Sequence, residues 1–475
     1  MKRVSTKIKW IFAVGQLGWS ILAGIISNLL VNFYLPDTTG GGIITFVTSA
    51  TFIGLTVIGL ITAGGRIVDA VTDPWIANLS DKCGHRLGKR IPFLRYSAVP
   101  FSVVTVLVFC CPVHGESPWN VVWLAVMLII FYISMTAYCT PYNALIPVLG
   151  REQKDRMDIS TYISLTYIVG TGIAFSGKMV WEALANATGM EYYLCARLTL
   201  GLLSLIALVC MLLPAFLIKE KDYDNSAPVN ENAFKSLAKT FKNKQFRIFV
   251  LSDVIYWIGI TIFNTGFIYY VENLLALKDA YMILFVFMTF VTFVCYVPVN
   301  MLSRKFGKKK LLVVGFFLFG LAFLVSAFAG KVTFIPNMAY GFIICVLVGV
   351  PLSILGVIPQ AIVADIAECD AAETGENHDA MFYAARTFAF KLGQSIAMII
   401  FTSLAVIGQY TDLDETGAEI IRNNGTGYRL SLVVALVLCV LAAVVVIFYN
   451  EKKTLATIEK AHEEALAAAK KNEEK

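Results

Sequence analysis

Twelve long apolar runs constrain what this chain can fold into more than any other feature of its sequence. A helix needs roughly 20 consecutive apolar residues to cross a bilayer. Hydrophobic residues make up 57% of the 475 residues and charged residues only 15%, whereas soluble domains have roughly 25% charged residues. We therefore predict an all-α membrane protein with 12 transmembrane helices. The runs cover 10–34, 43–78, 92–112, 119–145, 159–183, 196–218, 246–271, 280–302, 310–330, 334–364, 379–408 and 427–449.

The residue types that carry enzyme chemistry are scattered along the chain. The ten cysteines form no CxxC pair and stand mostly inside apolar runs, and the four histidines are far apart. Such cysteines are typical of small buried side chains rather than of a disulfide framework or a metal site. Since the sequence also has no nucleophile–base pair and no phosphate-binding loop, we expect no cofactor, no resident metal, no enzymatic activity and no nucleic-acid partner.

Lysine and arginine concentrate in alternate turns between the apolar runs. They occupy the N-terminus, the turns at 82–90, 151–156 and 304–310, the stretch 219–245 and the tail, whereas the opposite turns hold Lys278, Lys331 and Arg422. The side rich in these residues is the cytoplasmic side. Both termini are therefore predicted to be cytoplasmic, in a multi-pass protein of the cell membrane whose partner is the lipid bilayer. The turn after residue 364 is an exception, because it is acidic.

A short internal repeat indicates how the helices are grouped. "LSDKCG" at 79–84 and "LSRKFG" at 302–307 share the pattern L-S-x-K-x-G, and each follows an even-numbered run. Two six-helix halves with corresponding turns explain the repeat. We predict an N-terminal half at 1–218, a cytoplasmic loop at 219–245, a C-terminal half at 246–450 and a charged cytoplasmic tail at 451–475. This plan resembles the major facilitator superfamily, which implies a substrate cavity between the halves and function as a monomer.

Three charged residues in the second run are unusual inside a membrane. Arg66, Asp69 and Asp73 are spaced by three and four residues, so they share one face of a helix. Each costs roughly 2.5–3.5 kcal/mol or more at a helix centre. Two close carboxylates need a positive partner to stay ionised, and Arg66 supplies one charge. The remaining negative charge suits a proton or an alkali cation, since hard cations prefer oxygen ligands. A static ion cluster joining helices is the alternative.

Two longer segments resemble one family within that superfamily. "GRIVDAVTDPWIANLSD" at 65–81 and "VADIAECDAAETGENHDAMFYAARTFAFKLGQS" at 363–395 are similar to the helix 2 and helix 10–11 segments of the glycoside–pentoside–hexuronide cation symporters, the melibiose permease-like proteins. The resemblance implies that Asp69 and Asp73 bind the coupling cation, which is Na⁺, Li⁺ or H⁺. It also implies that Thr72 and Thr136 lie beside that cation. Lys391 matches the mid-membrane lysine of the family, near both sites, or it is a structural counter-charge to the two acids.

The sugar side of the family pattern is not retained. Cys139 and Asn143 stand where melibiose permease has a sugar-binding acid and a sugar-stacking aromatic residue, so melibiose specificity is not implied. A sugar pocket combines aromatic faces with hydrogen-bonding side chains, although any single aromatic residue in so apolar a chain can equally serve packing. The substrate-binding candidates are Lys391, Gln394, Tyr138, Tyr142, Asn143, Trp257 and Tyr383.

Charged residues on the cytoplasmic side are candidates for a gate. Asp81 and Arg86 stand in the first repeated turn, and Asp365 and Glu368 in the acidic turn. They could form ion pairs between the halves, with Arg151 or Arg304 as partners of the acidic turn, and exposed pairs of roughly 0–1 kcal/mol each can together bias a gate. The basic turns can equally be topology signals alone.

The sequence therefore predicts a secondary active transporter. Its expected function is cation-coupled (Na⁺ or H⁺) symport of a sugar or glycoside by alternating access. One alternative keeps the fold but carries a lipid-like or other organic solute, and another is a membrane sensor that does not transport.

Overall fold

A computed structural model of the chain describes residues 4–35, 46–47, 51–52, 55–150, 153–223, 240–277, 280–374, 379–413 and 419–473. The chain forms two compact units. The first comprises Met1–Asn232, Asn264–Ile283 and Ser395–Tyr428, and the second comprises Ala233–Phe263, Leu284–Gln394 and Arg429–Lys475. The first unit therefore contains the first six predicted spans together with two pieces of chain from beyond residue 246.

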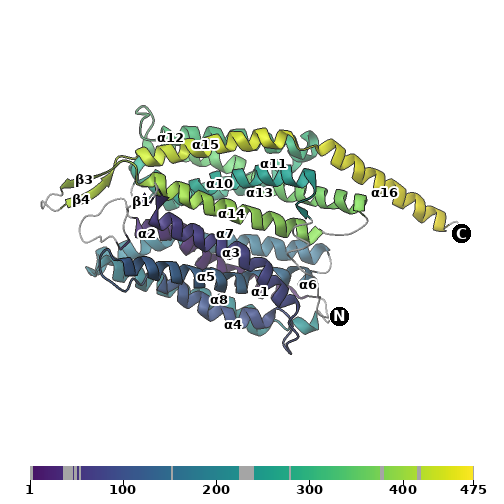
Figure 1. Cartoon of the computed structure of the whole chain (residues 1–475), viewed down its shortest axis with the longest axis horizontal. Coiled ribbons are helices and arrows are strands. Elements are labelled where there is room, and N and C mark those ends of the chain that lie inside the picture. Colours follow the sequence, from purple (N-terminus) through teal and green to yellow (C-terminus); the bar gives the residue numbers. More distant parts are fainter. Residues whose placement is uncertain are drawn as a thin grey trace. The chain divides into compact units, whose positions relative to one another are not determined.

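Helices of the first six spans pack side by side in the first unit (Figure 1). Helix α1 packs against α7 and α8, α3 against α5, and α4 against both α5 and α8. Their bounds are α1 Thr6–Gly24, η1 Ile25–Leu29, α2 Leu30–Tyr34, α3 Val57–Asp81, α4 Ile91–Leu107, α5 Pro118–Ala144, α6 Ile146–Leu149, α7 Gln153–Thr188, α8 Tyr192–Leu217 and the 3₁₀ turn η2 Glu220–Asp222.

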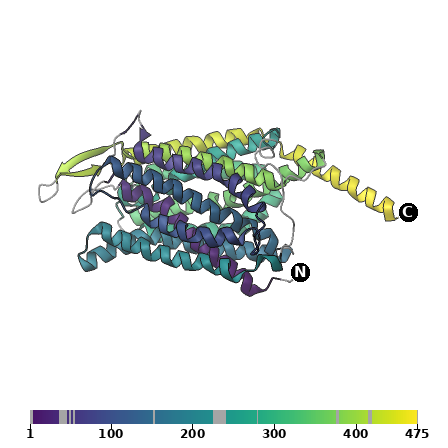
Figure 2. The same ribbon diagram turned by 60° about the horizontal axis from the view of Figure 1, so that its bottom comes forward.

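The later helices continue the same pattern of long apolar elements. Within the second unit α13 packs against α12 and, near the end of the chain, against α16. Figures 1 and 2 show α16 extending beyond its neighbours toward the C-terminus. The bounds are α10 Lys244–Tyr269, η3 Tyr270–Leu274, α11 Tyr281–Phe306, α12 Lys308–Ala327, α13 Asn337–Thr374, α14 Asp379–Ala405, α15 Thr426–Ile447 and α16 Glu451–Glu473.

The spans account for most of the helices. Among the described residues, ten helices are long and apolar enough to cross a membrane. The shorter apolar helix α4 and the charged helix α3 stand where the third and second spans are predicted. Membrane-spanning apolar helices are therefore confirmed, while the count of twelve and the cytoplasmic termini stay predictions.

Several predicted boundaries were wrong. The second run was expected to be helical from residue 43, but α3 begins at Val57 after two short antiparallel strands, β1 Thr51–Phe52 and β2 Leu55–Thr56. A second antiparallel pair, β3 Gln409–Leu413 and β4 Glu419–Asn423, was not predicted. Helix α13 continues to Thr374, so Asp365 and Glu368 are helical rather than part of a loop.

Close helix packing in the first unit depends on a small residue in α1. A Cβ atom at Gly18 would lie 2.5 Å from the main-chain oxygen of Ala207 in α8. Only glycine allows the two backbones to approach so closely, which is typical of helix contacts in membranes.

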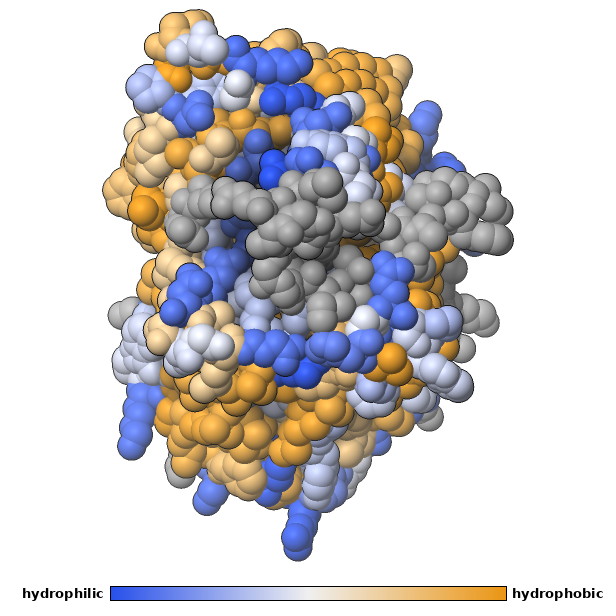
Figure 3. All heavy atoms as spheres, turned by 90° about the vertical axis from the view of Figure 1, so that its left-hand side faces the viewer, coloured by the Kyte–Doolittle hydropathy of each residue, from blue (hydrophilic) through white to orange (hydrophobic). Residues whose placement is uncertain are grey.

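The surface of the helices is strongly apolar. Large exposed hydrophobic side chains include Trp119, Phe290, Val297 and Phe334, whose exposed fractions are 71%, 63%, 68% and 85%. Figure 3 looks at the end that carries β3 and β4, and shows hydrophilic side chains on this end and apolar ones along the flanks. An apolar surface this extensive is unusual for a soluble protein and fits a lipid-facing one.

Candidate cation site

Two carboxylates of α3 face two hydroxyls of α5 inside the first unit. Thr136 Oγ1 donates a hydrogen bond of 2.8 Å to Asp69 Oδ1, and Thr140 Oγ1 donates one of 2.9 Å to Asp73 Oδ1. Both carboxylates and both hydroxyls are spaced by four residues, so each pair repeats one helical turn along its helix. The two helices therefore run parallel and meet in consecutive Asp–Thr pairs.

A third threonine adds another oxygen at the same place. Thr72 Oγ1 lies 3.2 Å from Thr136 Oγ1 and 2.9 Å from the main-chain oxygen of Val68. The side chain of Asp69 is fully buried, and Asp73 is half-buried. Carboxylate, hydroxyl and carbonyl oxygens are the ligands that hard cations prefer. Across the described part of the chain, no group of three or more His, Cys, Asp or Glu side chains could hold a metal ion.

Arg66 continues the row of contacts on the same face of α3. Its guanidinium donates a hydrogen bond of 3.0 Å to Ser27 Oγ in η1, and it lies 5.3 Å from the centre of the Tyr132 ring in α5. Tyr132 precedes Thr136 by four residues, so the stripe on α5 faces the whole Arg66–Asp73 stripe. The role of Arg66 in balancing the charge of the acids stays a prediction.

Thr140 is a candidate site residue that the sequence reasoning missed. The family resemblance pointed to Thr136 and Thr72 only. The available signal was the spacing: Thr136 and Thr140 are separated by four residues, as are Asp69 and Asp73.

Four predicted substrate residues lie in the second unit, one on α10 and three on α14. The indole ring of Trp257 in α10 stacks on Phe390 in α14 with 4.7 Å between ring centres. Its Nε1 is buried and has no hydrogen-bond partner among the described residues. Lys391 follows Phe390 directly, and Gln394 lies one turn further along α14. Tyr383, on the same helix, is 37% exposed and donates a hydrogen bond of 3.3 Å to the Gln360 main chain.

Other predicted substrate residues lie elsewhere. Tyr138 and Tyr142 are fully buried in the first unit, and their hydroxyls donate to the main-chain oxygens of Met211 and Phe12. This placement matches the packing role that the sequence also allowed. Asn143 is exposed at the end of α5. Whether any of the three contacts a substrate stays a prediction.

One gate candidate has an ion-pair partner among the described residues. Lys308 Nζ lies 2.7 Å and 2.6 Å from the two carboxylate oxygens of Asp365, and both residues belong to the predicted C-terminal half, so this ion pair does not join the two halves. Glu368 and Arg86 are exposed. The placement of Arg151 and of the Asp81 and Arg304 side chains lies outside the described residues.

Two further buried ion pairs were not predicted. Lys9, treated above as a topology signal, is 5% exposed and lies 2.7 Å from Asp155 and 2.6 Å from Asp158, joining α1 to α7. In the second unit the guanidinium of Arg386 in α14 binds Asp253 in α10 at 2.8 Å and 3.1 Å. Neither pair had a signal in the sequence, because each joins helices that are far apart along the chain.

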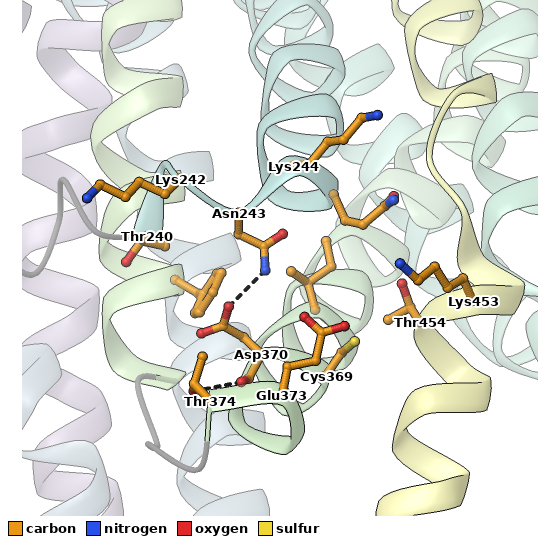
Figure 4. Close-up of a pocket in the computed structure, with 13 residues that line it drawn as sticks. Thr240, Lys242, Asn243, Lys244, Cys369, Asp370, Glu373, Thr374, Lys453 and Thr454 are labelled. Atoms are coloured by element: carbon orange, nitrogen blue, oxygen red, sulfur yellow. Dashed lines mark hydrogen bonds between the residues drawn. The ribbon is translucent and has the colours of Figure 1, made fainter.

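The second unit also contains a pocket of about 460 Å³ where α10 and α16 begin and α13 ends. In Figure 4, Asn243 and Asp370 point toward one another across a hydrogen bond of 2.9 Å. Glu373, Lys453 and Thr454 also line the pocket. It is lined by none of the predicted site residues.

The fold is that of a helical, multi-pass membrane protein, and the family comparison makes it a transporter. The chain belongs to the family described as MFS/sugar transport protein, whose model matches residues 12–451. The chain's homologues are transporters and symporters rather than enzymes. The resemblance predicted from the two sequence segments is thereby confirmed.

Individual relatives are distant. The chain is 23% identical to the lactose permease of Lactobacillus helveticus, over 94% of this chain and 70% of that protein. A shorter match, 32% identical over 26% of this chain and 23% of the other protein, is to the sodium-dependent lysophosphatidylcholine symporter 1 of Xenopus tropicalis. The solved structure of a D-xylose–proton symporter superposes with a TM-score of 0.65 at 15% identity, covering 94% of this chain and 98% of that one. That likeness shows the major facilitator fold alone.

Proposed function

We propose that this protein is a cation-coupled symporter that moves a sugar or glycoside across the membrane by alternating access. The single observation that carries the proposal is the pair of Asp–Thr contacts between α3 and α5, Asp69 with Thr136 and Asp73 with Thr140. Membership of a sugar transport family supports the substrate class. Both termini would be cytoplasmic, the protein would work as a monomer, and Arg86, Asp81 and Glu368 would contribute to the cytoplasmic gate.

The coupling ion in this proposal is an alkali cation, Na⁺ or Li⁺, rather than a proton. Asp69 and Asp73 each accept a hydrogen bond from a threonine hydroxyl, so every carboxylate of the pair has a second oxygen ligand beside it. Carboxylate and hydroxyl oxygens side by side suit a hard cation. Arg66 and Lys391 would then adjust the net charge of the occupied site.

The substrate would contact residues of α10 and α14. The Trp257 face and its buried Nε1–H offer a stacking surface and a donor, which is the combination that sugars require. Lys391 and Gln394 supply further polar groups on α14. Cation and sugar would favour the same conformation, so each would raise the affinity for the other by the same factor.

The test is counterflow and concentrative uptake by the purified protein in vesicles, with a panel of sugars and with Na⁺, Li⁺ and pH varied separately. Asp73→Asn should lose at least about tenfold of the uphill accumulation while keeping some sugar exchange, because one ligand charge is gone. Asp412→Asn, which changes a carboxylate that is 42% exposed, is the control. Full concentrative uptake by Asp73→Asn would refute the proposal.

A matched pair of variants tests the choice of ion. Thr140→Val removes the hydroxyl that binds Asp73 but keeps its shape, and Thr140→Ser keeps the hydroxyl. We expect Thr140→Val to need about tenfold more Na⁺ for half-maximal uptake and Thr140→Ser to stay near the wild type. Uptake that follows pH and ignores Na⁺ in the wild type would assign the coupling to protons instead.

A lipid-like solute is the second candidate, supported by the short match to the lysophosphatidylcholine symporter. Adding a lysophospholipid to the same counterflow panel separates the two. Exchange of the lysophospholipid without exchange of any sugar would replace the sugar by an amphipathic cargo and leave the cation site as proposed.

A further inference from the structure

A largely buried ion pair in the first unit joins α7 to the π-helix η3. Lys178 Nζ lies 2.7 Å from both carboxylate oxygens of Glu272, and the two side chains are 8% and 18% exposed. Glu182, one turn further along α7, lies 3.8 Å from the same nitrogen. The ring of Tyr281 lies 6.0 Å away. One ammonium group is thus held by two carboxylates and an aromatic ring.

The pair joins the two predicted halves of the chain, since Lys178 precedes residue 218 and Glu272 follows residue 246. Other contacts of the first unit do the same. Tyr269 Oη donates a hydrogen bond of 2.9 Å to the main-chain oxygen of Leu35, and the main-chain N–H of Thr56 donates one of 3.3 Å to Ser403 Oγ. The ion pair is therefore the charged member of a set of contacts between the halves.

Stability alone is a poor explanation for such a pair. The cost of removing two charges from water offsets most of their attraction, and buried pairs are best attested where they select one arrangement over another. Glu272 also lies inside a five-residue π-helix, Tyr270–Leu274, and π-helical turns frequently occur at functional sites.

We propose that Lys178 and Glu272 form a latch between α7 and η3. The latch holds the transporter closed at the end where these two helices meet, and the two side chains must separate before that end opens. The inference rests on the proposed function, because a latch between halves has a purpose only if the halves move apart. Glu182 makes the latch reversible. When Glu272 leaves, Lys178 keeps a carboxylate partner at the i+4 position of its own helix, so opening does not strand a buried charge.

The first experiment measures opening without any substrate. Phe175, 3% exposed and one turn before Lys178 on α7, is replaced by cysteine in a background free of the native cysteines, and its labelling by a membrane-impermeant maleimide is timed. Glu272→Gln keeps the shape of the side chain but removes its charge, and should label about tenfold faster. Glu272→Asp keeps the charge and should stay near the parent. Equal labelling rates for Glu272→Gln and the parent would overturn the latch.

The second experiment prevents opening. Lys178→Cys with Glu272→Cys, joined by a short reducible bis-methanethiosulfonate linker, should lose at least about tenfold of the counterflow rate and regain it on reduction. The control joins Ser102→Cys to Ser204→Cys, which lie on α4 and α8 of one half, and should keep its rate. Linked protein that still transports would overturn the latch. Absence of counterflow in the unlinked parent would instead count against the proposed function, and the labelling rates would then decide on the latch by themselves.

Discussion

In the two repeated turns, after α3 and after α11, a glutamate caps the start of the next helix, but the side chains around the two glutamates differ. After α3, Glu220 Oε2 accepts hydrogen bonds of 2.8 Å and 3.1 Å from the main-chain N–H groups of Arg90 and Ile91, where α4 begins. After α11, Glu451 accepts bonds of 2.7 Å and 3.2 Å from the N–H groups of Lys308 and Lys309, where α12 begins. In both places a glutamate that follows the sixth helix of its predicted half accepts hydrogen bonds from the backbone N–H groups at the start of the third helix, which have no partner within that helix.

The side chains around the two glutamates differ. Glu220 is 1% exposed and lies 3.6 Å from the Arg90 guanidinium, so its charge is neutralised locally. Glu451 is half-buried, and Lys308 sends its ammonium to Asp365 of α13 instead. Both repeated turns therefore keep the capping of backbone N–H groups by a glutamate, while the ion pairs around that glutamate differ between the turns. At the first turn the glutamate pairs with an arginine of the same turn. At the second turn an additional ion pair joins α12 to α13.

The largest expected effect comes from removing the more buried glutamate. Glu220→Ala leaves the Arg90 charge and two N–H groups of α4 without their acceptor, and should lower the free energy of unfolding by about 3 kcal/mol. Glu451→Ala removes a more exposed cap and should cost about 1 kcal/mol. Thermal unfolding in detergent, followed by tryptophan fluorescence, measures both. A larger loss of unfolding free energy for Glu451→Ala than for Glu220→Ala would contradict this prediction.

Substitution of the glycines beside the two glutamates should also destabilise the first turn more than the second, by smaller amounts. Gly88 and Gly307 both have positive φ, 117° and 88°, which other residues adopt at a cost of roughly 1–2 kcal/mol. A Cβ atom at Gly88 would lie 2.2 Å from Glu220 Oε2, whereas one at Gly307 would lie 3.1 Å from Glu451 Oε2. Gly88→Ala should therefore destabilise the protein by about 2 kcal/mol and Gly307→Ala by about 1 kcal/mol.

A double-mutant cycle separates backbone strain from the contact with the glutamate. In a Glu220→Ala background, Gly88→Ala should cost less than it does alone, because the carboxylate is gone and only the Cβ atom of residue 220, 2.7 Å away, stays close. Additive losses would show that the carboxylate adds nothing to the cost at residue 88.

The smallest effect is expected for the ion pair that distinguishes the second turn. Lys308→Met removes the partner of Asp365, but the two side chains are 29% and 13% exposed, so water screens part of the loss. We expect less than about 1 kcal/mol of destabilisation. Thermal unfolding at low and high salt checks this, with Lys452→Met as an exposed control on α16. A loss matching that of Glu220→Ala would show that the second turn depends on its side chains as strongly as the first.

Sequence reasoning reached the candidate cation site only in part. The spacing of Asp69 and Asp73 placed both acids on one face of a helix, and the family resemblance added Thr136. Thr140 was missed because its partner Asp73 lies 67 residues earlier in the chain, and no local pattern pairs residues of different helices. The pairing of Asp365 with Lys308 was not predicted for a related reason: α13 continues past the expected turn, so Asp365 stays on a helix within reach of Lys308.

The sequence by itself determined that this chain crosses a membrane, that it resembles a family of sugar transporters, and that two carboxylates share a face of α3. Run length, charge spacing and motif are local properties, and local properties can be read along a chain. Only the tertiary structure decided which groups those carboxylates contact, which glutamate caps which helix, and that Lys178 meets Glu272 94 residues away. These contacts depend on how helices pack, and packing is decided by side chains from several helices at once.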